Sequence, residues 1–290
     1  MNRILITGAT GNIGVEVIRH LYKTGTSNLI TAGVRNIEKA GDYFKNYPAL
    51  EFVHCDFENE DTFDQALAGV DRIFLLRPPH LAEVDKYFRP FIARAKEKNI
   101  REIIFLSVQG AEKSRVIPHN KIERLIHQFD LDYIFVRPGY FMQNLTTTLL
   151  NDIQKKREII LPAGKAKFNW IDIKDIGHAT AVLLDKFETH KNQAFEITGT
   201  KNATFGEVTS LINRVTKKPI RYRNINPLRY FWMKKQEGMA SGKIIVMIFL
   251  HFIPRFQKEP EISHAYEQLT GKKPTDLKEF IEREKSIFER

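Results

Sequence analysis

The N-terminal segment combines a short apolar run with three closely spaced glycines. Residues 4–6 are apolar, and Gly8, Gly11 and Gly14 follow before an amphipathic helical pattern. In such a strand–turn–helix unit the first glycine permits a tight turn, the second lets a diphosphate approach the backbone, and the third lets the helix pack close to the strand. The N–H groups at the helix start attract phosphate. The expected cofactor contacts are Gly8, Thr10, Gly11, Asn12, Ile13 and Gly14.

A basic side chain stands where the second expected strand ends. Arg35 follows residues 29–34, and Lys39 lies one helical turn further on. An acidic residue here would accept hydrogen bonds from ribose hydroxyls and select NAD, whereas an arginine can form a charge-assisted pair with a 2′-phosphate. The sequence therefore predicts that NADP(H) is preferred over NAD(H).

The loop after the fourth expected strand carries another candidate cation. Leu76 ends that strand, and Arg77 follows it in a loop stiffened by Pro78 and Pro79. Leu76 and Arg77 are expected beside the path of the diphosphate and ribose. Arg77 would meet a phosphate or an anionic substrate there, and a purely structural loop arginine is the alternative.

These candidates need a scaffold that brings several strand ends to one edge. Strand-like runs alternate with helical patterns through the first half of the chain, which is typical of a parallel sheet with helices on both faces. The sequence predicts an α/β fold, a Rossmann-type doubly wound parallel sheet with a smaller, mainly helical C-terminal lobe. The expected strands are 3–6, 29–34, 50–55, 72–76, 102–106 and 133–136, and the expected helices are 13–22, 37–44, 60–68, 81–97 and 119–128.

The regular alternation weakens after Pro138. We expect a hairpin or loop pair from 159–161 and 167–170, then a helix over 173–184 and a strand over 194–197, with a helical pattern from Lys201 on. A nucleotide-binding lobe is expected over 1–146, with 166–198 returning to it. A smaller substrate lobe is expected over 147–165 and 199–290, with a cleft at the carboxyl ends of the strands.

Composition limits the partners. The net charge is +10, but the basic residues are scattered and no DNA-binding motif is present, so a solvated basic surface is favoured over nucleic-acid binding. No apolar run is long enough to span a bilayer, and no signal-peptide pattern opens the chain. The single cysteine, Cys55, fits a reducing compartment, and no two histidines have metal-ligand spacing. We expect a cytoplasmic protein with no nucleic-acid, membrane or metal partner.

Two segments carry a resemblance to a known family. Residues 7–14, TGATGNIG, resemble the TGATGxxG signature of extended and atypical short-chain dehydrogenase/reductases. Residues 137–144, RPGYFMQN, are similar to the Arg-Pro-Gly-x-Phe-x-x-Asn segment of their NmrA-like branch, which includes quinone-reductase-like members. The resemblance covers most of the chain and is weakest over 224–260, where substrate specificity would reside.

The resemblance implies roles at further strand ends. An acidic residue after the third strand contacts the adenine amino group in this superfamily, and Asp56 matches it, with a turn cap as the alternative. Short-chain reductases commonly place a serine near Ser107 and follow it with Tyr-x-x-x-Lys, which supplies the proton; this chain lacks that pair. His119 falls where NmrA-like members carry lysine or histidine. His119, and less strongly Ser107, are the catalytic candidates.

The acceptor site is expected to include the aromatic pair that follows the sixth strand. Tyr140 and Phe141 could stack against a flat ring or pack between the lobes. The resemblance implies an NADPH-dependent reductase of a flat electron-poor small molecule, such as a quinone, azo compound or enone, whose product water or His119 could protonate. The alternative is a non-catalytic NADP(H)-sensing regulatory protein, and an epimerase is disfavoured by the missing tyrosine. A homodimer and a regulatory protein partner both stay open.

Overall fold

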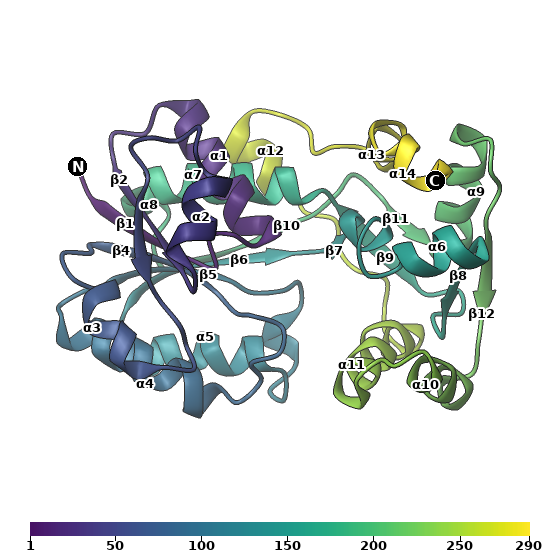
Figure 1. The fold of residues 1–290 in the computed structure, drawn as a ribbon, viewed down its shortest axis with the longest axis horizontal. Helices are drawn as coiled ribbons and strands as arrows, with labels where there is room; N and C mark the ends of the chain where they lie inside the picture. The colour runs from purple at the N-terminus through teal and green to yellow at the C-terminus, as the bar shows by residue number, and fades with distance from the viewer. The chain divides into compact units, whose positions relative to one another are not determined.

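A parallel sheet of seven strands forms the core of the first of two structural units (Figure 1). The computed structural model describes residues 1–290. In spatial order the strands are β10 (Gln193–Ile197), β6 (Asp132–Pro138), β5 (Glu102–Leu106), β4 (Arg72–Leu76), β1 (Arg3–Thr7), β2 (Leu29–Val34) and β3 (Glu51–His54). The chain reverses its direction of winding between β1 and β4, where doubly wound sheets bind their ligands. The predicted Rossmann-type fold is confirmed.

Helices cover both faces of this sheet. Figure 1 shows α1 (Asn12–Thr24) and α7 (Ile173–Asp185) on one face, and α4 (Val84–Glu97) and α5 (Pro118–Gln128) on the other. The amphipathic pattern explains α1, because Val17, Ile18 and Leu21 are fully buried on one side. The remaining helices of the unit are α2 (Ile37–Tyr43), α3 (Phe63–Ala66), α8 (Phe187–His190) and α12 (Ala265–Thr270).

The second unit contains two small sheets and several helices. One sheet has the order β11 (Asn202–Thr204), β9 (Lys167–Ile171), β7 (Tyr140–Phe141), and the other pairs β12 (Arg221–Asn224) with β8 (Glu158–Leu161). The helices are α6 (Leu150–Lys156), α9 (Phe205–Val215), α10 (Pro227–Gln236), α11 (Ser241–Phe252), α13 (Leu277–Arg283) and α14 (Lys285–Glu289). No helix of either unit is long and apolar enough to cross a bilayer.

Residues 159–161 and 167–170 were expected to form a hairpin or a loop pair, and the hairpin is wrong. β8 pairs in parallel with β12, and β9 pairs with β7 and β11. β8 and β9 therefore do not pair with each other. The loop between them holds a turn-like sequence, but the backbone N–H of Gly164 donates to Asn224 Oδ1 and ties the loop to the end of β12. β11 and β12 also interrupt the stretch that was expected to be helical from Lys201 on.

The unit boundaries differ from the expected lobes at several places. The first unit comprises Met1–Pro138, Ile173–Ile197 and Ala265–Lys272, and the second comprises Gly139–Asp172, Thr198–His264 and Lys273–Arg290. Residues 139–146 and 166–172 therefore belong to the second unit, because β7 and β9 pair there. Residues 265–272 return to the first unit, where Tyr266 of α12 donates a hydrogen bond to Asp175 of α7.

Candidate functional site

The glycine turn between β1 and α1 is open to a ligand. Gly8 has a positive φ of 59°, and the N–H of Gly11 donates to the Gly8 carbonyl at 2.9 Å, which closes the turn. Gly11 is the N-cap of α1 and no side chain caps the helix. Thr10, Gly11 and Asn12 are exposed. The N–H groups of the first helical turn thus have no side-chain cap and follow an exposed turn, as a phosphate site requires.

Gly14 and Gly11 have different roles in this turn. A Cβ on Gly14 would lie 2.5 Å from the Gly8 carbonyl oxygen and 2.8 Å from Ala9 Cα, so only glycine lets α1 approach the turn this closely. A Cβ on Gly11 would meet only the Gly8 oxygen, at 3.1 Å, and nothing else within 4 Å. The space outside Gly11 is therefore free for a ligand.

Two unpaired cations follow β2. Arg35 and Lys39 are exposed, and neither side chain forms an ion pair or hydrogen bond with the protein. Asn36 lies between them and caps α2 by accepting a hydrogen bond from the Lys39 backbone N–H at 2.8 Å. The Arg35 guanidinium is thus available to an anion beyond the end of the strand.

Asp56 caps a turn after β3. Its Oδ1 accepts the backbone N–H of Glu58 at 3.0 Å, and its own N–H donates to Thr62 Oγ1. This is the alternative role expected for Asp56. The second carboxylate oxygen makes no hydrogen bond in the structure, so the adenine contact stays a prediction.

The loop after β4 uses Arg77 to hold itself together. Arg77 Nη1 donates to the carbonyls of Pro78, Pro79 and Leu81 at 3.0–3.1 Å, and the buried Nε has no partner. Burial lowers the pKa of Arg77. Leu76 lies under the glycine turn, because a Cβ on Gly8 would come within 3.1 Å of its Cδ2. The structure therefore brings Leu76 to the turn and gives Arg77 a loop-stabilising role.

His119, at the start of α5, carries a neutral ring. Its side chain is partly exposed and forms no hydrogen bond with the protein. Burial first, and then the positive charge of Arg77, lower its pKa to about 3. A neutral imidazole cannot act as an imidazolium acid near neutral pH, but its N–H can still donate a hydrogen bond to an acceptor.

Ser107 belongs to a buried polar network rather than to an open site. It is 2% exposed, and its hydroxyl donates to Glu123 Oε1 at 2.6 Å. Arg137 donates from Nε and Nη2 to both oxygens of Glu123, at 3.0 and 2.7 Å, and from Nη1 to Glu112 at 2.8 Å. The Ser107 hydroxyl thus already has a partner inside the protein, and a catalytic role for Ser107 stays a prediction.

The sequence does not reveal that Glu123 and Arg137 form an ion pair. Arg137 stands in the RPGYFMQN segment that carries the family resemblance, but nothing in the spacing of Glu123 and Arg137 shows that α5 and β6 face each other here. The pair joins the helix that bears His119 to the strand that leads into the second unit. Its function in the structure is to position these elements.

Removal of the Glu123 carboxylate is expected to destabilise the fold strongly. Glu123→Ala would leave the largely buried Arg137 charge and the Ser107 hydroxyl without this partner, at a cost of about 3 kcal/mol. Glu112→Ala removes the more exposed partner of Arg137 and should cost less than about 1 kcal/mol. Urea unfolding of both variants measures the difference. Equal losses of stability would show that the buried pair does not hold the two elements together.

Tyr140 lies in the aromatic core of the second unit. Its hydroxyl is 2.9 Å from His251 Nε2, while His251 Nδ1 is 2.6 Å from the Met247 carbonyl, so the tyrosine is the donor. Burial raises the pKa of Tyr140 and lowers that of His251 to about 4. The Tyr140 ring also contacts Phe168, Trp170, Phe205 and His251. Tyr140 therefore packs against this aromatic cluster, and stacking of Tyr140 or Phe141, which are both partly buried, against a flat acceptor stays a prediction.

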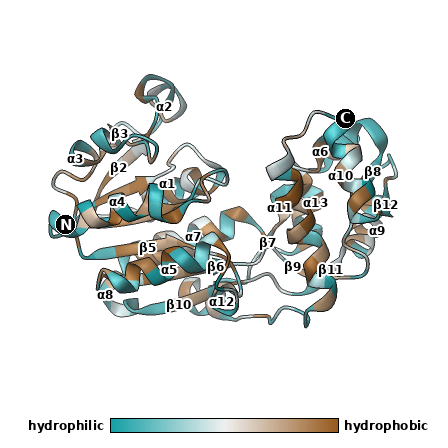
Figure 2. Ribbon diagram, turned by 90° about the horizontal axis from the view of Figure 1, so that it is seen from below, coloured by the Kyte–Doolittle hydropathy of each residue, from teal (hydrophilic) through white to brown (hydrophobic).

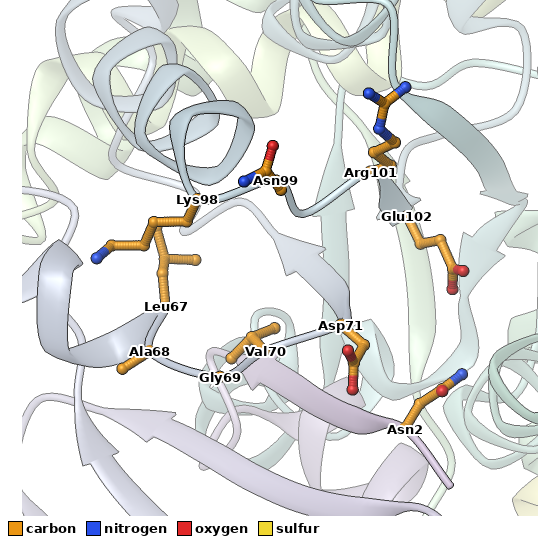
Figure 3. Close-up of a pocket in the computed structure, with 10 residues that line it drawn as sticks. All are labelled: Asn2, Leu67, Ala68, Gly69, Val70, Asp71, Lys98, Asn99, Arg101 and Glu102. Atoms are coloured by element: carbon orange, nitrogen blue, oxygen red, sulfur yellow. The ribbon is translucent and has the colours of Figure 1, made fainter.

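A surface hollow at the amino ends of the strands of the seven-stranded sheet is not part of this site (Figure 3). It measures about 700 Å³ and is lined at the amino ends of β1, β4 and β5. Three of its charged groups already have partners: Asp71 accepts the Arg3 N–H, Glu102 pairs with Arg72, and Lys98 pairs with Asp64. The glycine turn and Arg35 lie at the carboxyl ends of the strands instead.

Comparison with known proteins identifies the family. The NmrA-like family model matches residues 1–281. The chain belongs to the NmrA-like family.

Relatives of this NmrA-like chain include several proteins of known name. It is 30% identical over 281 residues to prestalk A differentiation protein A of Dictyostelium discoideum, covering 96% of the chain and 90% of the relative. It is 29% identical over 223 residues to an NAD(P)H azoreductase of Xenophilus azovorans, covering 76% of each. The solved NADPH complex of an Escherichia coli NADPH-dependent quinone oxidoreductase has a TM-score of 0.86 at 23% identity, over 97% of the chain and 99% of that protein.

Proposed function

We propose that this chain is an NADPH-dependent reductase of a flat, electron-poor small molecule: a quinone, an azo compound or an enone. The observation that carries the proposal is the open glycine turn with unpaired Arg35 beyond the neighbouring strand. The named activities of the azoreductase and quinone oxidoreductase relatives support the acceptor class. The bound cofactor would supply a hydride from its nicotinamide ring.

The residues of the first unit fit a phosphorylated dinucleotide. Gly11 leaves the space outside the turn free, and the uncapped N–H groups at the start of α1 would hold the diphosphate. Arg35, assisted by Lys39, would pair with the 2′-phosphate. Leu76 would support the turn from below.

His119 would hydrogen-bond to the acceptor molecule rather than act as a general acid. The neutral ring of His119 carries one N–H group and forms no hydrogen bond with the protein. This N–H could donate a hydrogen bond to an oxygen or nitrogen of the acceptor molecule. A reduced quinone or azo compound needs little acid catalysis, and water could complete its protonation. Proximity between the two bound molecules would then supply most of the rate enhancement.

Loss of the Arg35 side chain should remove the preference for NADPH. The wild type is expected to bind NADPH more tightly than NADH, and Arg35→Ala should weaken NADPH binding by about ten- to a hundredfold, which corresponds to about 1.5–3 kcal/mol for a charge-assisted contact. NADH binding should stay nearly unchanged. Fluorescence titration with both cofactors measures these affinities, and equal wild-type affinities would contradict the role of Arg35.

Steady-state turnover tests the proposed reaction. NADPH oxidation is followed by nicotinamide absorbance with a naphthoquinone, an azo dye and an enone in turn. We expect oxidation with at least one of these acceptors. Tight NADPH binding without oxidation by any acceptor would instead favour a non-catalytic sensor of NADP(H).

A further inference from the structure

The start of α5 holds hydrogen-bond donors that no protein group uses. Ile117 is the N-cap, so no side chain caps the helix, and the first turn contains no acidic residue. The backbone N–H groups of His119 and Asn120 form no hydrogen bond with the protein, and the first intrahelical bond runs from Lys121 to Ile117. Such N–H groups lie at the positive end of the helix dipole and attract negative charge.

The Asn120 side chain is an unpaired polar group on the buried side of α5. It is 6% exposed, and it shares this side with Ile122, Leu125 and Ile126. Figure 2 shows the mixed apolar and polar character of the helix in brown and teal. Asn120 Oδ1 is buried without a hydrogen-bond partner, and its Nδ2 donates to no protein group. Because buried polar groups are nearly always paired, this amide points to a ligand or to an ordered water.

The Asn120 amide lies at the edge of the sheet that carries the glycine turn. α5 follows β5, so the helix begins at the carboxyl ends of the strands. Glu123, one turn further along the same side of the helix, accepts a hydrogen bond from Ser107 directly after β5. Because the Cα–Cβ bonds of a helix tilt towards its N-terminus, the Asn120 side chain leans past the end of β5 towards the uncapped N–H groups.

Arg77 adds positive charge at this place. Its guanidinium forms no ion pair and donates only to the carbonyls of its own loop. Its charge reaches the start of α5, because Arg77 is the one charged side chain that lowers the pKa of His119. The charge of Arg77 is therefore not neutralised by the protein.

The carboxylates on the surrounding elements have other partners. Those nearest to α5 gather around Arg137, and the others face the loop after β4 or the start of α4, which packs against α5. They are Glu112, Glu123 and Glu196 around Arg137, Glu58 opposite His80, and the exposed Glu83, which acts on Lys86. None of them lowers the positive charge at His119, while Arg115 and Lys121 add exposed cations.

We propose that the start of α5 binds the negative charge that hydride transfer places on the acceptor molecule, an inference that rests on the proposed reductase function. The backbone N–H groups of His119 and Asn120 and the Asn120 amide donate hydrogen bonds to the anionic atom, and Arg77 supplies the positive charge. A half-turn about the Cβ–Cγ bond exchanges Oδ1 and Nδ2 of Asn120, so its amide can face the anion with the N–H groups.

The reaction needs such an anion site. The hydride leaves C4 of NADPH with its electron pair and forms a bond to the acceptor, so NADPH becomes NADP⁺. The electron pair of the broken π bond moves to an oxygen or nitrogen of the acceptor, which stays anionic until water supplies a proton. Donors that are held in place before the charge develops stabilise the transition state. Because the His119 ring is neutral, the start of α5 would hold the anion rather than protonate it.

Binding of 4-nitrophenol to the protein–NADP⁺ complex tests the site without turnover. This phenol ionises near neutral pH, and its absorbance distinguishes the phenolate from the neutral form. We expect the wild-type complex to bind the phenolate at least about tenfold more tightly than the phenol. The nicotinamide cation favours the phenolate equally in wild type and variants, so the difference between them reports on α5.

Two variants of Asn120 test its part in the site. Asn120→Leu has a similar size but no hydrogen-bonding group, so it should weaken phenolate binding and lower kcat with a naphthoquinone by about a hundredfold, while NADPH affinity stays nearly unchanged. It should not lower the urea midpoint of the protein without cofactor, because it removes a buried oxygen that has no partner. An asparagine that only supports the fold would instead lose stability when replaced.

Asn120→Asp places a carboxylate where the anion would bind. It should abolish the preference for the phenolate over the phenol, because like charges repel. The matched control is Gln128→Glu, the same change from amide to carboxylate at the exposed far end of α5, which should leave phenolate binding and kcat nearly unchanged. Circular dichroism establishes that each variant is folded.

The outcomes separate this inference from the proposed function. Failure of the wild-type complex to bind the phenolate more tightly than the phenol would overturn the anion site. Undiminished phenolate binding and turnover in folded Asn120→Leu would do the same while leaving the reductase function in place. Phenolate binding that Asn120→Asp abolishes, without NADPH oxidation by any acceptor, would contradict the reductase function and retain the anion site.

Discussion

NADPH binding is expected to be lost when valine replaces Gly11, while the fold is retained. Gly11 has φ −76° and ψ 161°, an extended conformation that valine readily adopts. The added side chain would project into the free space outside the turn, where the diphosphate must reach the N–H groups of α1. We expect affinity to fall by at least about a hundredfold, which is close to 3 kcal/mol. Fluorescence titration measures the affinity, and circular dichroism measures the fold.

A substitution at the other end of α1 is the matched control. Gly25 ends this helix with a positive φ of 70°, and a Cβ added at this position would have no neighbour within 4 Å. Gly25→Ala should therefore cost about 1 kcal/mol of stability through backbone strain and leave NADPH affinity unchanged. A folded Gly11→Val variant that still binds NADPH like the wild type would place the phosphates elsewhere.

Turnover is expected to fall by up to about 10²–10⁴-fold when His119 is replaced by alanine. The neutral ring donates to the acceptor in the proposed reaction, so NADPH affinity should change much less than kcat. His119→Gln keeps an N–H donor of similar reach and should recover part of the lost rate. Stopped-flow or steady-state absorbance with a quinone acceptor measures all three proteins.

The pH dependence gives His119 an independent test. Its pKa is lowered from 6.5 to about 3, so the ring stays neutral through the physiological range and gains a proton only well below it. The wild-type rate should therefore not change stepwise near pH 6.5 through titration of His119. The pH profiles of the wild type and of His119→Ala should have the same shape there. Such a step, or wild-type turnover that His119→Ala leaves untouched, would contradict the assigned role while sparing the reductase assignment.

The local sequence pattern was sufficient to predict the strands of the parallel sheet but not the short strands of the second unit. The expected strands at 29–34, 72–76 and 102–106 match β2, β4 and β5, because apolar runs between turn residues specify buried parallel strands. β11 and β12, with the sequences NAT and RYRN, carry no apolar period and form only because β9 and β8 are there to pair with them. Residues 265–272 join the first unit through Tyr266, a contact that no local pattern reveals.

In the candidate site, too, local sequence pattern predicts local features but not contacts between separate elements. Glycine spacing predicts the turn because its requirements are local: Gly8 has a positive φ, and Gly14 sits too close to the turn for a Cβ. Ser107 was placed correctly at a strand end, but its partner Glu123 lies on another element, so its burial could not be inferred. The neutrality of His119 likewise depends on burial and on Arg77 from a separate loop.

Single turnover of the preformed NADPH complex tests the central claim most directly. The protein is mixed with one equivalent of NADPH, binding is established by fluorescence, and a naphthoquinone, an azo dye or an enone is then added in rapid mixing. We predict that nicotinamide absorbance decays with at least one acceptor, and that the decay slows when the transferred hydrogen at C4 is deuterium. A complex that forms stoichiometrically but keeps its absorbance with every acceptor would contradict the assignment as a reductase.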